Sequence, residues 1–395
     1  MYRNLDYDAL PKGERRKRLR EIVLVFLRLG ALAFGGPAAH IAMMEESVVQ
    51  RRSWLPRQKF MDLLGATNLI PGPNSTEMAI LLGFERGGYA GLFLAGAAFI
   101  LPAVIIVSVF AYLYVRFGAL PQVAGALVGV KPVIMAVVLQ ALLRLGKSAV
   151  KGALTAMVGA AVIELAFLGV EEILLLLLAG LVTTAVMNWE KIKTRLFSLP
   201  LPMLALLAQP GAAEPAQGPA RMALSGIFLT FFKIGAVLYG SGYVLLAYLD
   251  SEFVARFGAI TTQQLMDAVA VGQVTPGPVF TTATFIGYLI GGLPGGLAGT
   301  AGIFLPSFLL VLLINPIIPR LRKSPWVGAA LDGVNVASLG IMAVVTVRLG
   351  AASLVDPFTV ALFIAAAVLL LRYKVNSAWL ILAGGLLGYI YTAWM

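Results

Sequence analysis

The sequence predicts an all-α polytopic membrane protein whose two halves are related by an inverted, pseudo-two-fold repeat. Apolar residues make up 59% of the 395 residues and charged residues only 12%, whereas soluble domains hold about 45–50% and about 25%. Apolar stretches of about 18 residues or more, the length that spans hydrocarbon, recur along nearly the whole chain. The two halves also match each other, while their corresponding loops differ in basic charge.

The internal repeat is visible in short motifs that recur at a nearly constant offset. The segment 26–31, Phe-Leu-Arg-Leu-Gly-Ala, matches 231–236, Phe-Phe-Lys-Ile-Gly-Ala. A Pro-Gly-Pro motif at 71–73 recurs at 276–278. A match that is nearly free of gaps over a long stretch indicates duplication.

The basic residues of the loops indicate that the halves are inverted. Loop 45–60 carries four Arg or Lys residues and its partner 250–264 carries one, whereas loop 116–121 carries one and its partner 319–325 carries three. Basic loops are retained on the cytoplasmic side of a membrane. Corresponding loops are therefore expected on opposite sides.

The loop charges also predict two re-entrant helical hairpins in each half. Basic regions lie on both sides of segment 21–44, so both of its ends are expected on the cytoplasmic side. Loops 45–60 and 116–121 are expected on opposite sides, which allows one crossing between them, yet two apolar segments, 61–84 and 88–116, lie there. We therefore expect 21–44 and 61–84 to be hairpins, broken at 35–37 and 71–73, with equivalent breaks at 240–242 and 276–278. About four transmembrane helices per half follow, near 88–116, 122–143, 152–169 and 173–188, and near 291–318, 327–347, 354–371 and 377–394.

The chain divides into four regions. Residues 1–20 form a basic cytoplasmic tail, 21–195 the first repeat, 196–220 a linking helix (196–209) with an external linker, and 221–395 the second repeat. Inversion requires the linking helix to cross the membrane, although it is short. The C-terminus is then external, and no secretory signal is recognisable.

The composition also excludes several classes of function. The chain has no cysteine and one histidine, so it has no disulfide and no Cys/His metal cluster, and we expect no metal and no cofactor. Enzymes that use Ser–His or Cys–His chemistry are disfavoured for the same reason. The net charge of +11 lies in loops between apolar segments, which indicates a lipid bilayer and not nucleic acid as the partner.

The breaks predict a binding site for an anion. Pro lacks an amide hydrogen and Gly permits unusual dihedral angles, so Pro-Gly-Pro interrupts a helix. The half-helix that begins after such a break directs its positive end toward it. In inverted-repeat transporters these ends meet near the midplane and hold the substrate. The alternative is that each motif is an ordinary interfacial turn.

Several segments resemble the chromate ion transporter family in its long, two-domain form. They are 26–37, which ends Phe-Gly-Gly-Pro, then His40, then 68–74, Asn-Leu-Ile-Pro-Gly-Pro-Asn, and 273–278, Gln-Val-Thr-Pro-Gly-Pro. The resemblance implies movement of chromate, usually outward, across the inner membrane with the proton motive force, and sulfate as a related oxyanion. A passive anion channel and a membrane-embedded phosphatase remain alternatives, and dimerisation stays open.

Candidate site residues lie at the breaks and among the charges within apolar segments. Arg28 and Lys131 are expected to balance the charge of the anion, although Arg28 could instead snorkel to the interface. Glu77 and His40 are candidates for proton coupling, and Glu77 could instead be structural. The candidate substrate-binding residues are Arg28, Gly35, Gly36, Asn68, Pro71, Gly72, Pro73, Asn74, Ser75, Lys131, Lys233, Gly240, Ser241, Gln273, Pro276, Gly277, Pro278 and Thr281.

Overall fold

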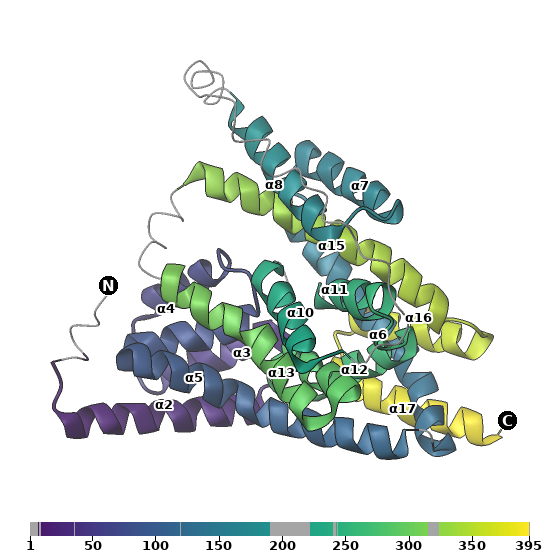
Figure 1. Ribbon diagram of the computed structural model, residues 1–395, viewed down its shortest axis with the longest axis horizontal. Helices are drawn as coiled ribbons and strands as arrows, with labels where there is room; N and C mark the ends of the chain where they lie inside the picture. The colour runs from purple at the N-terminus through teal and green to yellow at the C-terminus, as the bar shows by residue number, and fades with distance from the viewer. Residues whose placement is uncertain are drawn as a thin grey trace.

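Figure 1 shows a computed structural model of the chain, and every regular element that it describes is helical. The residues described are 7, 9–34, 36–118, 120–189, 222–239, 242, 244–314 and 324–394. The predicted linking helix 196–209 and three candidate residues, Gly35, Gly240 and Ser241, lie outside them.

Both halves contain the same order of elements. The first half consists of α2 (Lys12–Leu32), α3 (Gly36–Glu45), η1 (Glu46–Gln50), α4 (Arg57–Thr67), α5 (Asn74–Phe117), α6 (Pro121–Ala149), α7 (Ala153–Phe167) and α8 (Glu172–Met187). The second half consists of α10 (Leu224–Val237), α11 (Leu245–Leu249), η4 (Asp250–Arg256), α12 (Thr262–Val274), η5 (Val279–Thr281), α13 (Thr282–Ile314), α15 (Pro325–Ser353), α16 (Pro357–Arg372) and α17 (Ser377–Trp394). Even the π-helical turns η1 and η4 recur at corresponding places.

The helices break where the glycine and proline motifs predict. One break separates α2 from α3, and a second, centred on Pro71-Gly72-Pro73, separates α4 from α5. Gly72 has a φ of +132° and its counterpart Gly277 a φ of +91°, a backbone conformation that side chains with a Cβ disfavour. The motif therefore stops the helix by the local conformation of its own residues.

The long helix α5 turns back on itself at Gly87-Gly88. Gly88 has a φ of +57°, and a Cβ added to Gly83 would lie 2.3 Å from the carbonyl oxygen of Gly91. The residues before and after the turn therefore form two closely packed, antiparallel arms. α13 turns in the same way at Gly291-Gly292. The predicted spans near 88–116 and 291–318 correspond to the second arms.

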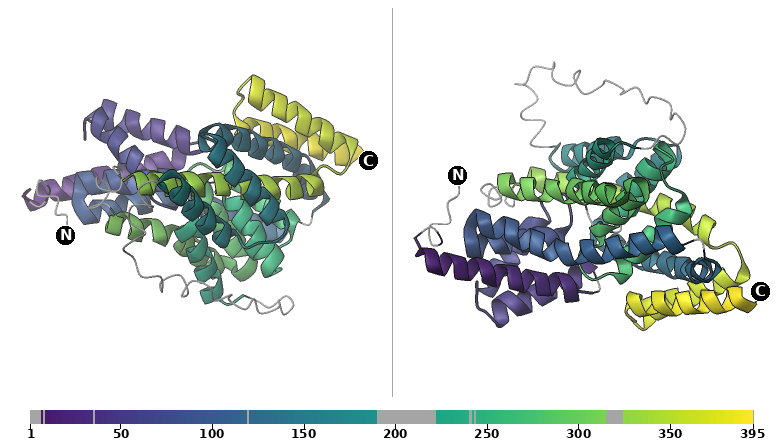
Figure 2. Two further views of the ribbon diagram at one scale, coloured as in Figure 1. Left: turned by 90° about the horizontal axis from the view of Figure 1, so that it is seen from above. Right: turned by 60° about the horizontal axis from the view of Figure 1, so that its bottom comes forward.

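The two halves exchange helices. α6 of the first half packs against α16 and α17 of the second, and α15 of the second half packs against α7 and α8 of the first. Figures 1 and 2 show α17 alongside α6 near the C-terminus. α6 and α15 also touch, and they run antiparallel, because Gly146 lies beside Leu339 while Met135 lies beside Gly350.

The outer surface is suited to a lipid environment. Five of the described helices are long and apolar enough to cross a membrane, and four more are apolar but shorter. Large apolar side chains are exposed on them, including Leu181, Leu313 and Trp394. Exposed apolar surface on this scale is expected of a chain that is embedded in hydrocarbon. The chain is a multi-pass membrane protein.

Candidate functional site

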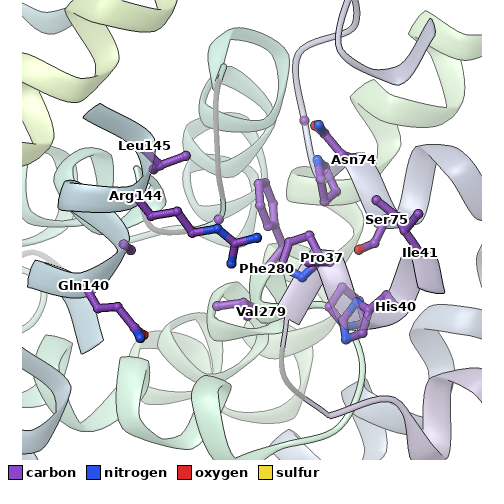
Figure 3. Close-up of a pocket in the computed structure, with 16 residues that line it drawn as sticks. Pro37, His40, Ile41, Asn74, Ser75, Gln140, Arg144, Leu145, Val279 and Phe280 are labelled. Atoms are coloured by element: carbon purple, nitrogen blue, oxygen red, sulfur yellow. The ribbon is translucent and has the colours of Figure 1, made fainter. Parts of the chain in front are cut away.

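A cavity of about 270 Å³ lies where the breaks of both halves meet the helix α6 (Figure 3). Segments that are far apart in the sequence contribute to it, since breaks from both halves lie around the same point. Its lining residues are Pro37, Ala38, His40, Ile41, Gly72, Pro73, Asn74, Ser75, Gln140, Ala141, Arg144, Leu145, Gly242, Pro278, Val279 and Phe280. The predicted convergence of the breaks therefore produces a cavity.

Two reciprocal hydrogen bonds hold the breaks in place. The amide of Gly72 donates to the carbonyl oxygen of Leu238 over 2.8 Å, and the amide of Gly277 donates to that of Ala33 over 2.9 Å. Each bond joins a Pro-Gly-Pro motif of one half to the end of the first helix of the other half. These two amide hydrogens already have an acceptor, so binding of an anion depends on other groups of the cavity.

Arg144 is the cation among the described lining residues of this cavity, and it is not one of the candidate residues predicted from the sequence. Its guanidinium extends toward Pro37 and Phe280 (Figure 3). It makes no ion pair with any residue that the structure describes. Arg144 lies just beyond the predicted span near 122–143, whereas α6 continues to Ala149. The α6 residues that line the cavity follow a helical spacing: Gln140, Ala141, Arg144 and Leu145. Continuing the helical period beyond residue 143 could therefore have identified Arg144 from the sequence.

His40 lines the same cavity from α3. Its ring is 1% exposed and packs edge-on against Phe99, with 5.6 Å between the ring centroids. Nε2 lies 3.1 Å from the carbonyl oxygen of Ala33, the same oxygen that accepts from Gly277. Nδ1 has no hydrogen-bond partner among the described residues. The ring is thus fixed at one nitrogen and unsatisfied at the other.

A second cavity, of about 510 Å³, adjoins the first and shares Asn74 and Leu145 with it. Asn74 donates through Nδ2 to Oδ1 of Asn68 over 3.0 Å. Lys151 and Asp332 also line this second cavity and form an ion pair of 2.6 Å. The second cavity therefore continues the first between α6 and α15.

Glu77 lies close to the central cavity but does not line it. It is 0% exposed, and the hydroxyl of Ser307 donates to its Oε1 over 3.5 Å. A Cβ added to Gly72 would lie 2.5 Å from both that carboxylate oxygen and the hydroxyl of Ser307. The carboxyl group is therefore enclosed behind the first Pro-Gly-Pro motif, at the contact between α5 and α13.

The other predicted cations lie outside the central cavity. Arg28 lines a separate cavity with Arg51, Arg52 and Glu46. Lys131 is buried and lies 3.7 Å from Oδ1 of Asp267, whose Oδ2 accepts a hydrogen bond of 2.8 Å from Tyr114. Lys233 forms an ion pair of 2.8 Å with Glu252. The structure therefore does not bring these three cations to the breaks.

The remaining candidates have mainly backbone roles in this structure. The hydroxyl of Thr281 donates to the carbonyl oxygen of Pro278 over 2.9 Å. Gln273 lines a small void beside Thr282. Pro71 and Pro276 are buried at the breaks, and Gly36, with a φ of +78°, begins α3.

Comparison with known proteins finds similarity along most of the chain. A family profile described as "Chromate transporter" matches residues 20–184 and again 225–389. The chain is 32% identical over 370 residues to the "Chromate transport protein" of Cupriavidus metallidurans, covering 93% of this chain and 92% of that protein. It is 31% identical over 380 residues to the "Chromate transport protein" of Pseudomonas aeruginosa, covering 92% and 90%.

A shorter relative matches only part of the chain. The "Uncharacterized transporter YwrA" of Bacillus subtilis is 32% identical over 130 residues, which make up 33% of this chain and 73% of that protein. No solved structure gives a significant match. The double match of the family profile agrees with the duplication that the sequence motifs indicate.

Proposed function

The chain belongs to the chromate transporter family, whose members are transporters and not enzymes, and on that premise we propose that it moves chromate or a related tetrahedral oxyanion such as sulfate across the cell inner membrane. The observation that carries the proposal is the central cavity, which is lined by breaks of both halves and contains Arg144. No carboxylate is among its described lining residues. Such a cavity favours an anion over a cation.

The chemistry of the lining residues suits a tetrahedral oxyanion. The planar guanidinium of Arg144 offers several donors in a fork that matches two oxygens of such an ion. α3 and α5 both begin at the cavity, and the positive ends of their dipoles favour negative charge there. Asn74 and Ser75 add polar side chains at the start of α5. A volume of about 270 Å³ leaves room for the ion and a few waters.

We infer further that the two halves are inverted in the membrane. The antiparallel contact of α6 with α15 supports this, because equivalent helices that run in opposite directions across a bilayer have opposite topology. The helical hairpins that precede the turn at Gly87-Gly88 in α5 and the turn at Gly291-Gly292 in α13 then enter the membrane and return to the same side. The basic loop 45–60 and the N-terminus are cytoplasmic in this arrangement, and the C-terminus is external.

Coupling to the proton motive force, with outward transport, completes the proposal. Glu77 and His40 are the titratable candidates, and only His40 lines the cavity. A passive anion channel with the same architecture is the competing function, and a flux measurement separates the two.

The test is flux in vesicles that contain the purified protein. Labelled chromate, sulfate and phosphate are offered with and without an imposed pH gradient. A carrier accumulates chromate or sulfate against its gradient only when the pH gradient is present, whereas a channel equilibrates the ion in either case. Absence of flux of all three anions would refute oxyanion transport.

A further inference from the structure

Resting on the proposed function and deepening it, the geometry points to His40 as the group that takes up a proton together with the oxyanion. His40 is the one histidine of the chain, and its ring lines the central cavity. The coupled proton then lies on a single nitrogen atom, Nδ1. The proton and the dianion then cross the membrane together with one net negative charge, so the inside-negative membrane potential, one component of the proton motive force, drives the pair outward.

The partner of Nε2 determines which nitrogen carries hydrogen in the neutral ring. Nε2 lies 3.1 Å from the carbonyl oxygen of Ala33, and because a carbonyl oxygen only accepts, Nε2 must donate. The amide of Gly277 donates to the same oxygen over 2.9 Å, so both lone pairs of that oxygen are used. The neutral ring therefore carries its hydrogen on Nε2 and an unshared pair on Nδ1.

Nδ1 is the nitrogen that is free to change. It has no hydrogen-bond partner among the described residues, and the ring is 1% exposed. A bare Nδ1 presents a lone pair and repels the oxygens of an anion in the cavity. A protonated Nδ1 becomes a charged donor to the same oxygens. Uptake of one proton therefore changes the interaction between the ring and the anion from repulsive to attractive.

The surrounding charges leave this role open for His40. Arg144 of α6 is the one cation among the described lining residues of the cavity, and no carboxylate is among them. Other charged groups on the elements around α3 lie elsewhere or are paired: Glu77 behind Gly72, Arg28 in a cavity with Glu46, Glu21 with Arg86, and Lys59 with Glu85. An ion with two negative charges would thus meet one fixed positive charge. Uncompensated buried charge is costly, and protonation of His40 supplies the second positive charge.

A proton taken up by His40 should affect the binding of dianions and monoanions differently. Sulfate stays doubly ionised near neutral pH, so any dependence of its binding on pH belongs to the protein. Binding that takes up one proton tightens by about tenfold for each unit that the pH falls, as long as the free ring is neutral. Perrhenate, a tetrahedral monoanion, is already balanced by Arg144, and its binding is expected to change less than about twofold over the same range.

The experiment observes His40 directly, because a protein with one histidine gives one pair of ring-nitrogen signals when histidine is labelled with ¹⁵N. The purification tag must contain no histidine. At about pH 7.5 the labelled protein in lipid nanodiscs should show a neutral ring with hydrogen on Nε2. Saturating sulfate should convert the Nδ1 signal to that of a protonated nitrogen, and saturating perrhenate should not.

A matched variant and a proton count complete the test. His40→Gln retains an amide that can donate to Ala33 but has no titrating nitrogen, so its sulfate affinity should no longer rise as the pH falls. In weakly buffered solution the wild-type protein should take up about one proton per sulfate bound. A neutral ring in the sulfate complex, or uptake of no proton, overturns the assignment to His40 and leaves oxyanion transport standing. Failure to bind any oxyanion overturns both.

Discussion

The amide of Gly72 donates a hydrogen bond of 2.8 Å to the carbonyl oxygen of Leu238, and the equivalent bond of 2.9 Å joins Gly277 to Ala33. The two bonds are related by the internal repeat, and each of them crosses from one half to the other. The cavity between them is consequently a joint product of both halves. Neither Pro-Gly-Pro motif is held in place by its own half alone.

The first prediction concerns the conformation of Gly72. Its φ is +132°, and a Cβ would lie 2.5 Å from the side chains of Glu77 and Ser307. Gly72→Ala should lower the stability of the protein by about 2 kcal/mol or more and abolish oxyanion flux. Thermal unfolding in detergent and vesicle flux measure the two effects.

Gly226→Ala is the matched control for Gly72→Ala. Gly226 lies within α10, and an added Cβ there would meet only ordinary contacts, at 3.7 Å or more from Met222. Stability and flux should be unchanged or slightly improved, since Ala favours a helix. Normal flux from Gly72→Ala would show that the first motif is only a turn.

The second prediction concerns the charge of Arg144. Arg144→Gln should weaken chromate and sulfate binding by about 10- to 100-fold, the loss expected for a hydrogen bond to a charged group. Arg144→Lys should lose less, because it keeps the charge but not the fork of donors. Lys147→Gln, one turn further along α6 and exposed, is the control and should bind normally. Equal binding by Arg144→Gln and the wild type would place the anion elsewhere.

The sequence predicted the breaks because their signals are local, whereas the predicted span near 122–143 ended before α6 does at Ala149. Proline and glycine stop a helix through their own backbone, so the Pro-Gly-Pro breaks could be recognised without a structure. The turns at Gly87-Gly88 and Gly291-Gly292 were not predicted. The packing of α6 against α17 could not be predicted, since an apolar helix face does not specify its partner. Charge within an apolar segment predicted Arg28 and Lys131 as the cations that bind the anion. Tertiary packing, which the sequence pattern does not specify, brings Arg144 to the cavity instead.

The third prediction separates the two candidates for proton coupling. Glu77 is 0% exposed and accepts a hydrogen bond from the hydroxyl of Ser307, and an ionised carboxylate there would be buried without a cation. Glu77→Gln, which keeps the size and a group that Ser307 can donate to, should therefore keep both stability and pH-driven transport. Flux under an imposed pH gradient is the measurement. Normal exchange without any dependence on the pH gradient would assign the coupled proton to Glu77 and not to His40.

The fourth prediction tests the proposed inverted topology. The chain contains no cysteine, so single cysteines can be introduced without removing others. Gln50 and Ala255 are exposed and equivalent in the two halves. In intact cells, a membrane-impermeant thiol reagent should label Ala255→Cys and spare Gln50→Cys until the membrane is permeabilised. Labelling of both from one side would show that the halves are parallel.

The last prediction compares two Lys–Asp pairs that both join the halves. Lys131 and Asp267 have side chains that are 8% and 2% exposed, whereas those of Lys151 and Asp332 are 60% and 16% exposed. Lys131→Met leaves a buried carboxylate without its cation and should cost about 3–5 kcal/mol of stability. Adding Asp267→Asn to it should recover much of the loss, because no uncompensated charge then remains.

Lys151→Met, in the exposed pair, should cost less than about 1 kcal/mol, since water already screens that interaction. Thermal unfolding of the wild type and these three variants in the same detergent gives the comparison. Sulfate binding is measured on the double variant of the buried pair, which should bind like the wild type because Lys131 lies outside the cavity. If the double variant folds but does not bind sulfate, Lys131 contributes to substrate binding, as the sequence predicted.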